Sequence, residues 1–135
     1  MLAAIAALFL PLFLSIEPTQ AQAGQDKALA LSLSRAFAEW FDHDRTAKGG
    51  KFLLYDPDEK VVLALETVTL ADGDHLHRLD DGRFLSWGEF KDGAGHAYML
   101  DFYFRRAAET FAFDHEITIF SRNKVKRYGW DETGP

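Results

Sequence analysis

Hydrophobic and polar residues alternate along three neighbouring stretches in the second half of the chain. The stretches are rich in aromatic side chains and run from Arg83 to Phe90, from His96 to Phe104 and from Thr110 to Ser121. A Lys-Asp-Gly-Ala-Gly turn separates the first two, and a short break separates the last two. Aromatic runs divided by turn residues predict a three-stranded antiparallel meander.

A different hydrophobic period precedes the meander and predicts one long helix. From Ala28 to Ala47 the apolar residues recur three and four positions apart, which places them on one face of a helix. Asp26 can cap its start, and Gly49-Gly50 should end it. The expected core face consists of Leu29, Leu33, Phe37, Trp40 and Phe41, with Leu31 and Ala36 alongside.

Further strands are predicted on both sides of the meander. Lys51–Tyr55 and Lys60–Thr69 flank Asp56-Pro57-Asp58, a type I turn signature, and so indicate a hairpin. His75–Leu79 is a short extended piece, and Lys124–Trp130 is interpreted as an additional edge strand. One long N-terminal helix followed by about five or six strands predicts an α+β fold, with the helix packed on a curved antiparallel sheet.

This order of elements resembles the cystatin-like and NTF2-like rolls. The resemblance rests on the helix Ala28–Ala47 and the aromatic meander Phe84–Phe120. NTF2-like domains normally place further short helices after the first, whereas here Ala47-Lys-Gly-Gly50 leads straight into a strand, which favours the cystatin-like form. The resemblance implies a cone-shaped sheet whose mouth often holds a small ligand or a second subunit. Enzymes and binding proteins share such folds, so the resemblance does not specify a function.

The first 23 residues have the features of an export signal. Leu2–Leu14 is almost wholly apolar, and a more polar stretch leads to Ala21-Gln22-Ala23, an Ala-x-Ala cleavage site. The apolar run is shorter than the roughly 20 residues that a membrane span needs. We therefore expect cleavage near Ala23-Gly24, a single α+β domain over 24–135, and a periplasmic or secreted location. An uncleaved anchor is the alternative, because no Lys or Arg precedes the apolar run.

Composition narrows the classes of partner. The net charge is −6, and the basic residues cluster only at Arg122, Lys124, Lys126 and Arg127, which argues against a nucleic-acid partner. Cysteine is absent, so disulfides, thiolate chemistry and Cys-based zinc sites are excluded. No motif in the sequence specifies a reaction or requires a cofactor.

Asp101 is the first candidate for chemistry, because it lies within the most apolar strand of the meander. Alternation places it on the face opposite the core residues, and a desolvated carboxyl there would have a pKa above about 4 and act as a general base. Glu89 is its expected cross-strand neighbour, because a hairpin joins the two runs, and paired carboxylates can act as an acid and a base. The alternatives are an exposed sheet face or an ion pair with Arg83, Arg105 or Arg106.

Charged residues also lie in the middle of the third meander strand. Strict alternation places His115 on one face with the apolar residues Phe111, Phe113, Ile117 and Ile119. Asp114 and Glu116 then lie beside Thr118 on the other face, where they could form an acidic patch with Asp101. A solvated face explains these charges equally well.

His75 and His77 are candidate metal ligands. Residues two apart share a face of a strand, so both imidazoles could reach one divalent metal, with Asp74 orienting them. His96 and His115 are further candidates from neighbouring strands, and such a site suits zinc, copper or nickel. The alternative interpretation is a polar rim strand beside an Asp-rich turn.

These patterns lead us to expect an exported, non-catalytic binding domain for a small ligand or a protein partner. The expected contact surface consists of aromatic side chains, which make efficient binding anchors: Trp87, Tyr98, Tyr103 and Trp130. The alternatives are a small roll-type enzyme with Asp101 as general base, and a periplasmic metal binder through His75 and His77. An open cone mouth or a free sheet edge would allow a homodimer.

Overall fold

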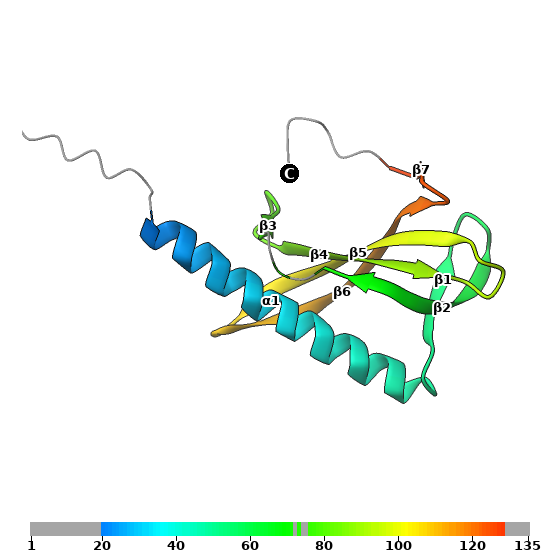
Figure 1. Ribbon diagram of the computed structural model, residues 1–135, viewed down its shortest axis with the longest axis horizontal. Helices are drawn as coiled ribbons and strands as arrows, with labels where there is room; N and C mark the ends of the chain where they lie inside the picture. Colours follow the sequence, from blue (N-terminus) through cyan, green and yellow to red (C-terminus); the bar gives the residue numbers. More distant parts are fainter. Residues whose placement is uncertain (1–19, 72, 74–75, 129–135) are drawn as a thin grey trace, which may run out of the picture.

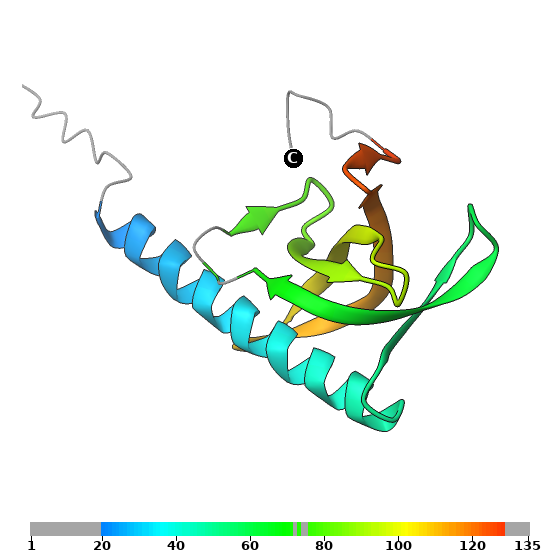
Figure 2. The ribbon, with the colours of Figure 1, turned by 45° about the vertical axis from the view of Figure 1, so that its right-hand side comes forward.

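A long helix packs against one face of a curled antiparallel sheet, which forms a half-barrel in the computed structural model (Figures 1 and 2). The structure describes residues 20–71, 73 and 76–128, with side chains from residue 22 onward. The elements are α1 Gln20–Ala47, β1 Phe52–Asp56, β2 Val61–Leu70, β3 His77–Arg78, β4 Phe84–Lys91, β5 Ala97–Ala107, β6 Thr110–Arg122 and β7 Val125–Lys126.

The sheet confirms the predicted α+β class and the meander. Its strands follow the order β1-β2-β4-β5-β6-β7, and β3 pairs with β4 beside this path. All pairings are antiparallel. The predicted hairpin is formed by β1 and β2, and the predicted last edge strand is β7. The described part of the sheet has seven strands, rather than five or six, because both short segments pair with longer neighbours.

The helix starts earlier than the apolar pattern indicated. It is already formed at Gln20, because Ala and Gln, which dominate the segment before Asp26, are good helix formers. Asp26 therefore lies inside the helix and does not cap it. Its carboxylate instead accepts a hydrogen bond from Arg78 in β3, at 3.0 Å.

The end of the helix agrees with the sequence. The Gly50 amide bonds the Arg45 carbonyl at 2.8 Å, and the Gly49 amide bonds the Thr46 carbonyl at 3.2 Å. These two bonds form a Schellman motif, which needs a left-handed backbone after the helix. Gly49 supplies it with a φ of 77°.

The core lies between the helix and the sheet and is built mainly from aromatic rings. Phe37 contacts Phe102 with ring centroids 4.6 Å apart, and Trp40 stacks on Phe113 at 3.9 Å. Leu31 was expected beside this face but is 44% exposed, because it lies about 200° around the helix from the buried Leu33. The other buried apolar residues of the cluster include Phe41, Phe52, Leu63, Leu65, Phe90, Leu100 and Phe104.

Asp56 and Arg127 join the two ends of the strand path. Asp56 ends β1 and is fully buried, and Arg127 follows β7. The guanidinium donates to both carboxylate oxygens, at 2.5 and 2.9 Å. These bonds hold the pKa of Asp56 below its usual value and raise that of Arg127. The pair therefore closes one side of the half-barrel through side chains rather than through a backbone ladder.

Two irregularities in β6 change which residues share a face. Phe102 pairs with Ile117, and Phe104 pairs with Phe113. A step of two residues along β5 therefore corresponds to a step of four residues along β6. His115 sits in this bulge with a φ of 56° and is exposed. The expectation that His115 lies in an apolar stripe is therefore wrong, because the bulge interrupts the alternation.

The bulge also separates the acidic residues of β6 from Asp101. Glu116 and Asp114 contact Arg83, with Asp114 at 3.6 Å, and Asp114 also accepts a hydrogen bond from Arg105 at 3.0 Å. These residues form an ion-pair network at the surface rather than an acidic patch with Asp101.

Candidate functional site

Asp101 lies on the sheet face opposite the helix and belongs to a cluster of hydroxyl groups. In the register, Trp87 of β4 and Thr118 of β6 flank it. The side chain is buried, with 4% of its surface exposed. The Tyr128 hydroxyl, just after β7, donates a hydrogen bond to Asp101 Oδ2. We call Asp101, Tyr128, Thr118 and Tyr103 the carboxyl–hydroxyl chain.

The direction of each proton in this chain follows from the carboxylate at its end. An ionised carboxylate only accepts, so Tyr128 donates to Asp101. Tyr128 has then used its proton, so Thr118 must donate across the 2.6 Å contact with Tyr128 Oη. Tyr103 in turn donates to Thr118 Oγ1, at 3.2 Å. All three hydroxyl protons therefore point toward Asp101 when it is charged.

Burial sets the protonation behaviour of this chain. Desolvation raises the pKa of Asp101 to about 6, although the hydrogen bond from Tyr128 acts in the opposite direction. Burial and the neighbouring carboxylate also raise the pKa of Tyr128, which keeps the phenol protonated as a donor. Asp101 is therefore charged at neutral pH and becomes protonated in mildly acidic solution.

A groove of about 260 Å³ opens beside two members of the chain. It lies between the β1–β2 turn and the edge of β6. Asp101 reaches this groove through Tyr128, which lines the groove and donates to the carboxylate. The residues that line it are Leu54, Tyr55, Pro57, Asp58, Ile117, Thr118, Ile119, Arg127 and Tyr128.

Two of the four aromatic residues proposed as a contact surface are buried in the structure. Tyr98 is 3% exposed, and its hydroxyl accepts a hydrogen bond from Arg122 at 3.1 Å. Tyr103 is 8% exposed and lies under the Arg83 guanidinium, 4.7 Å from the ring centre. Trp87 is half-buried, and Trp130 lies outside the described residues. These side chains do not form an exposed aromatic patch in the described part of the chain.

Glu89 and Asp101 are not brought together as a cross-strand pair. The register places Glu89 opposite Met99, and Glu89 is exposed. Glu89 and Met99 line a separate groove of about 280 Å³ with Val68.

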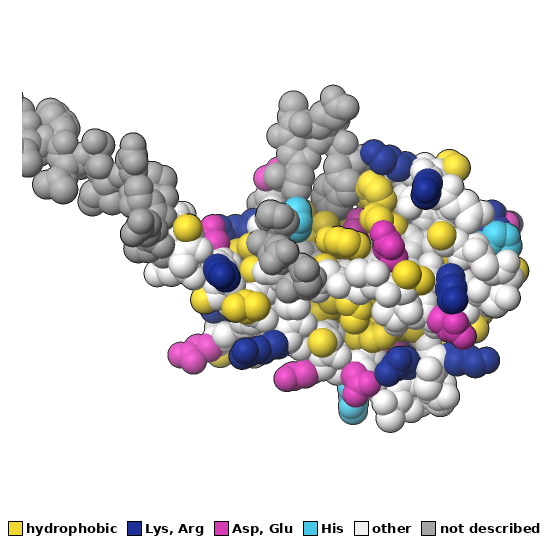
Figure 3. Space-filling model, viewed as in Figure 1, with side chains coloured by type: hydrophobic (Ala, Val, Ile, Leu, Met, Phe, Trp, Pro, Cys, Tyr) yellow, Lys and Arg dark blue, Asp and Glu magenta, His cyan; other side chains and the backbone are white. Residues whose placement is uncertain are grey.

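On the face of the molecule in Figure 3, hydrophobic side chains gather over the sheet between scattered charged residues.

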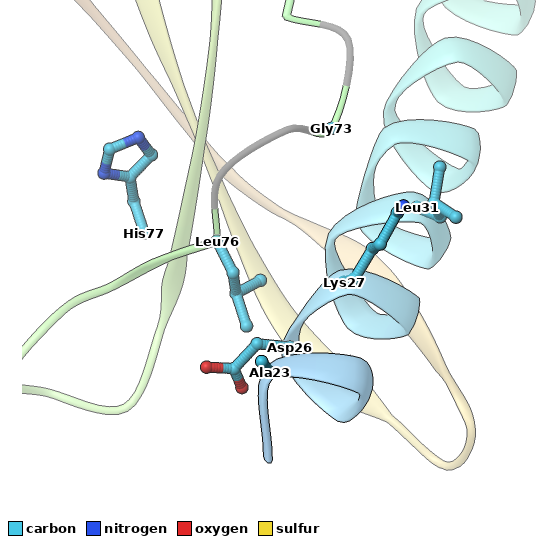
Figure 4. Close-up of a pocket in the computed structure, with 7 residues that line it drawn as sticks. All are labelled: Ala23, Asp26, Lys27, Leu31, Gly73, Leu76 and His77. Atoms are coloured by element: carbon cyan, nitrogen blue, oxygen red, sulfur yellow. The ribbon is translucent and has the colours of Figure 1, made fainter. Parts of the chain in front are cut away.

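The histidines are dispersed in the described structure. His75 and Asp74 lie outside the described residues, so the predicted His75–His77 site is not described as a unit. His77 lines a groove of about 820 Å³ between the start of α1 and β3, where Leu76 separates it from Asp26 (Figure 4). His96 Nδ1 contacts Asp92 Oδ2 at 2.7 Å. Among the described residues, no three His, Asp or Glu side chains converge as metal ligands.

Sequence reasoning did not identify Thr118 or Tyr128 as members of the site. Asp101 and Tyr128 are 27 positions apart, and their contact depends on how the chain turns back after β7. Thr118 can be recognised as the hydroxyl-bearing residue opposite Asp101 only when the register between β5 and β6 is known.

Comparisons with known proteins add no family to this description. Nothing matches the chain among protein-family models, curated proteins or solved structures. Within the described residues, no helix combines the length and the hydropathy that crossing a membrane requires. The candidate site therefore has to be interpreted from its own geometry.

Proposed function

We propose that the protein is a non-catalytic binding domain that holds a small, partly apolar ligand in the groove beside Thr118 and Tyr128. The observation that carries this proposal is the direction of the carboxyl–hydroxyl chain. Because Thr118, which lines the groove, donates its proton toward Tyr128 and Asp101, its oxygen can only accept a hydrogen bond from a ligand there. The site would therefore select a ligand that donates a hydrogen bond.

The charges around the groove favour a cationic donor. Asp58 lines the groove, and its side chain is 63% exposed. Arg127 also lines the groove, but its guanidinium is bound to both oxygens of Asp56. The charged form of Asp101 lies directly behind Tyr128. The net charge of the groups around the groove is therefore negative. Apolar walls such as Leu54 and Ile117 complement a hydrocarbon body, so an apolar amine fits the site best.

The proposal also includes the cellular location of the protein and its fold family. The Ala-x-Ala sequence before Gly24 supports export, so the ligand would be met in a periplasm or outside the cell. One helix on a curled antiparallel sheet supports a cystatin-like roll. The net charge of −6 supports a small molecule or protein partner rather than nucleic acid.

Matched probes of opposite charge test this proposal. We expect 2-phenylethylamine to raise the melting temperature at neutral pH, and 3-phenylpropionate to leave it unchanged. At about 100 times its Kd, the amine should stabilise the protein by roughly 2.7 kcal/mol. Thr118→Val should reduce this gain, because valine keeps the shape of threonine but not its hydroxyl. Thr69→Val in β2 is the control, since Thr69 is exposed and does not line the groove.

Two results would contradict the proposal: equal stabilisation by the amine and the acid, or the same amine affinity in Thr118→Val and Thr69→Val.

The pH dependence of amine binding gives an independent check. Protonated Asp101 becomes a donor to Tyr128, so the hydroxyl proton of Tyr128 or Thr118, both of which line the groove, is free to turn toward it. With a pKa of about 6 for Asp101, amine affinity should be about tenfold weaker at about pH 5 than at neutral pH.

A small enzyme is the second candidate, and the raised pKa of Asp101 is the observation that favours it. A carboxylate with a pKa of about 6 is a suitable general base, and Tyr128 could pass a proton from the groove to it. This reaction would need a bound substrate within hydrogen-bond reach of Tyr128. Turnover that is lost in both Asp101→Asn and Tyr128→Phe would favour the enzyme over the binding domain.

A further inference from the structure

The outer face of the β1–β2 hairpin exposes a group of large hydrophobic side chains. Leu53 and Tyr55 of β1 are 38% and 57% exposed, and Val62 of β2 is 66% exposed. Tyr55 pairs with Val62 across the hairpin, so these side chains form one continuous surface. Leu63 and Leu65 on the opposite face are buried in the core. A contiguous exposed apolar surface is a mark of a protein–protein interaction site.

We propose that this hairpin face packs against the same face of a second copy of the chain, with the two β1 strands antiparallel. This proposal does not rest on ligand binding in the groove, although Tyr55 and Asp58 also line that groove. Strand β1 ends the strand path and pairs only with β2 among the described strands. Because Leu53, Tyr55 and Val62 are all exposed on this face, a second copy can approach it without displacing a described element.

The positions of the two large β1 side chains suit a two-fold contact. Leu53 and Tyr55 lie one residue before and one residue after Leu54. A two-fold axis beside Leu54 therefore places Leu53 of one copy against Tyr55 of the second copy. Each apolar contact is made twice, and neither large side chain meets its own equivalent. An isologous interface needs this kind of self-complementary surface.

Charges at the two ends of β1 are complementary in the same arrangement. Lys51 precedes β1, is exposed, and has no ion-pair partner among the described residues. Asp58 follows β1, and its exposed carboxylate is 3.5 Å from Arg127 Nε, which is already held by Asp56. Antiparallel packing brings Lys51 next to Asp58 of the second copy. Parallel packing would bring Lys51 next to Lys51, so the charges select the antiparallel dimer.

The first experiment measures molar mass by sedimentation velocity over a range of protein concentrations. We expect a dimer that dissociates on dilution. Leu53→Glu should give a monomer at every concentration, because it places a charge in the apolar contact. The matched control is Leu31→Glu, since Leu31 is 44% exposed on α1 and lies outside the hairpin. A monomeric unsubstituted protein, or an unchanged dimer in Leu53→Glu, would overturn the proposal.

A charge exchange tests the orientation and does not depend on the folding of Leu53→Glu. Lys51→Glu and Asp58→Lys should each weaken self-association by about tenfold or more, because each creates two like-charge contacts. Mixing the two variants should restore association as a heterodimer, since the exchanged charges then face their opposites. A mixture that associates no better than the separate variants would refute antiparallel packing. Circular dichroism verifies that each variant keeps the native secondary structure.

Discussion

Replacing Asp101 by Asn isolates the cost of ionising a buried carboxyl group. The Asp101 side chain is 4% exposed. Its pKa is about 6 in the folded protein, against an ordinary value of 3.8. Asparagine keeps the shape of the side chain, and its oxygen can still accept the hydrogen bond from Tyr128. The amide carries no charge at any pH, so the variant resembles the protonated form of Asp101.

The sign and size of the effect follow from the two pKa values. Between about pH 4 and pH 6 the folded protein retains a proton that the unfolded chain has released. The free energy of unfolding therefore falls as the pH rises through this window, and the penalty is complete above about pH 6. A shift of about two units corresponds to about 3 kcal/mol. Asp101→Asn carries no such penalty. Its free energy of unfolding should therefore rise by about 3 kcal/mol relative to that of the unsubstituted protein over the same pH window.

Urea unfolding of both proteins at a series of pH values measures this difference. The carboxyls of Asp56, Asp81 and Asp92 have lowered pKa values and make both proteins less stable in acid. Their contributions cancel when the two proteins are compared at each pH, because these groups are present in both. A difference in the free energy of unfolding that stays constant from about pH 4 to neutral pH would refute the assignment of Asp101 as a desolvated carboxyl.

Two further substitutions test the fold. Asp56→Ala should lower the free energy of unfolding by about 3 kcal/mol, because it leaves Arg127 without its buried partner, and a loss below about 1 kcal/mol would contradict this role. Gly88→Ala should cost about 1–3 kcal/mol, since the added carbon would lie 2.7 Å from the Phe90 ring. Gly93→Ala meets nothing within 4 Å and should change the stability by less than about 0.5 kcal/mol. Chemical denaturation measures all three, and equal losses in the two glycine variants would argue against the tight packing at Gly88.

The elements that could be predicted from the sequence are those whose periodicity is local and unbroken. Phe37 and Phe41 lie one helical turn apart, and both are buried. Phe102 and Phe104 alternate along β5, and both face the core. The prediction for β6 was wrong at His115, because the bulge adds residues on that strand and nothing in its composition indicates a break. The start of α1 was also missed, since its first turns present no apolar stripe.

The candidate site could be predicted only in part, for a related reason. Alternation along β5 correctly places Asp101 on the face away from the helix, because that strand is regular around it. Its partners depend on the register between strands and on the return of the chain after β7. Thr118 is opposite Asp101 only because of the β6 irregularities, and Tyr128 is 27 residues away. Pattern alone does not encode these long-range placements.

The ion pair between Asp56 and Arg127 has a consequence for the order of folding. Its members are 71 positions apart, with the entire meander between them. Closing a loop of this length loses chain entropy that local pairs such as β4–β5 do not lose, so the contact should form after the strands have assembled. An interaction absent from the folding transition state acts on the unfolding rate rather than on the folding rate. The pair would therefore act as a kinetic latch that determines how long the native state persists before the chain opens to proteolysis.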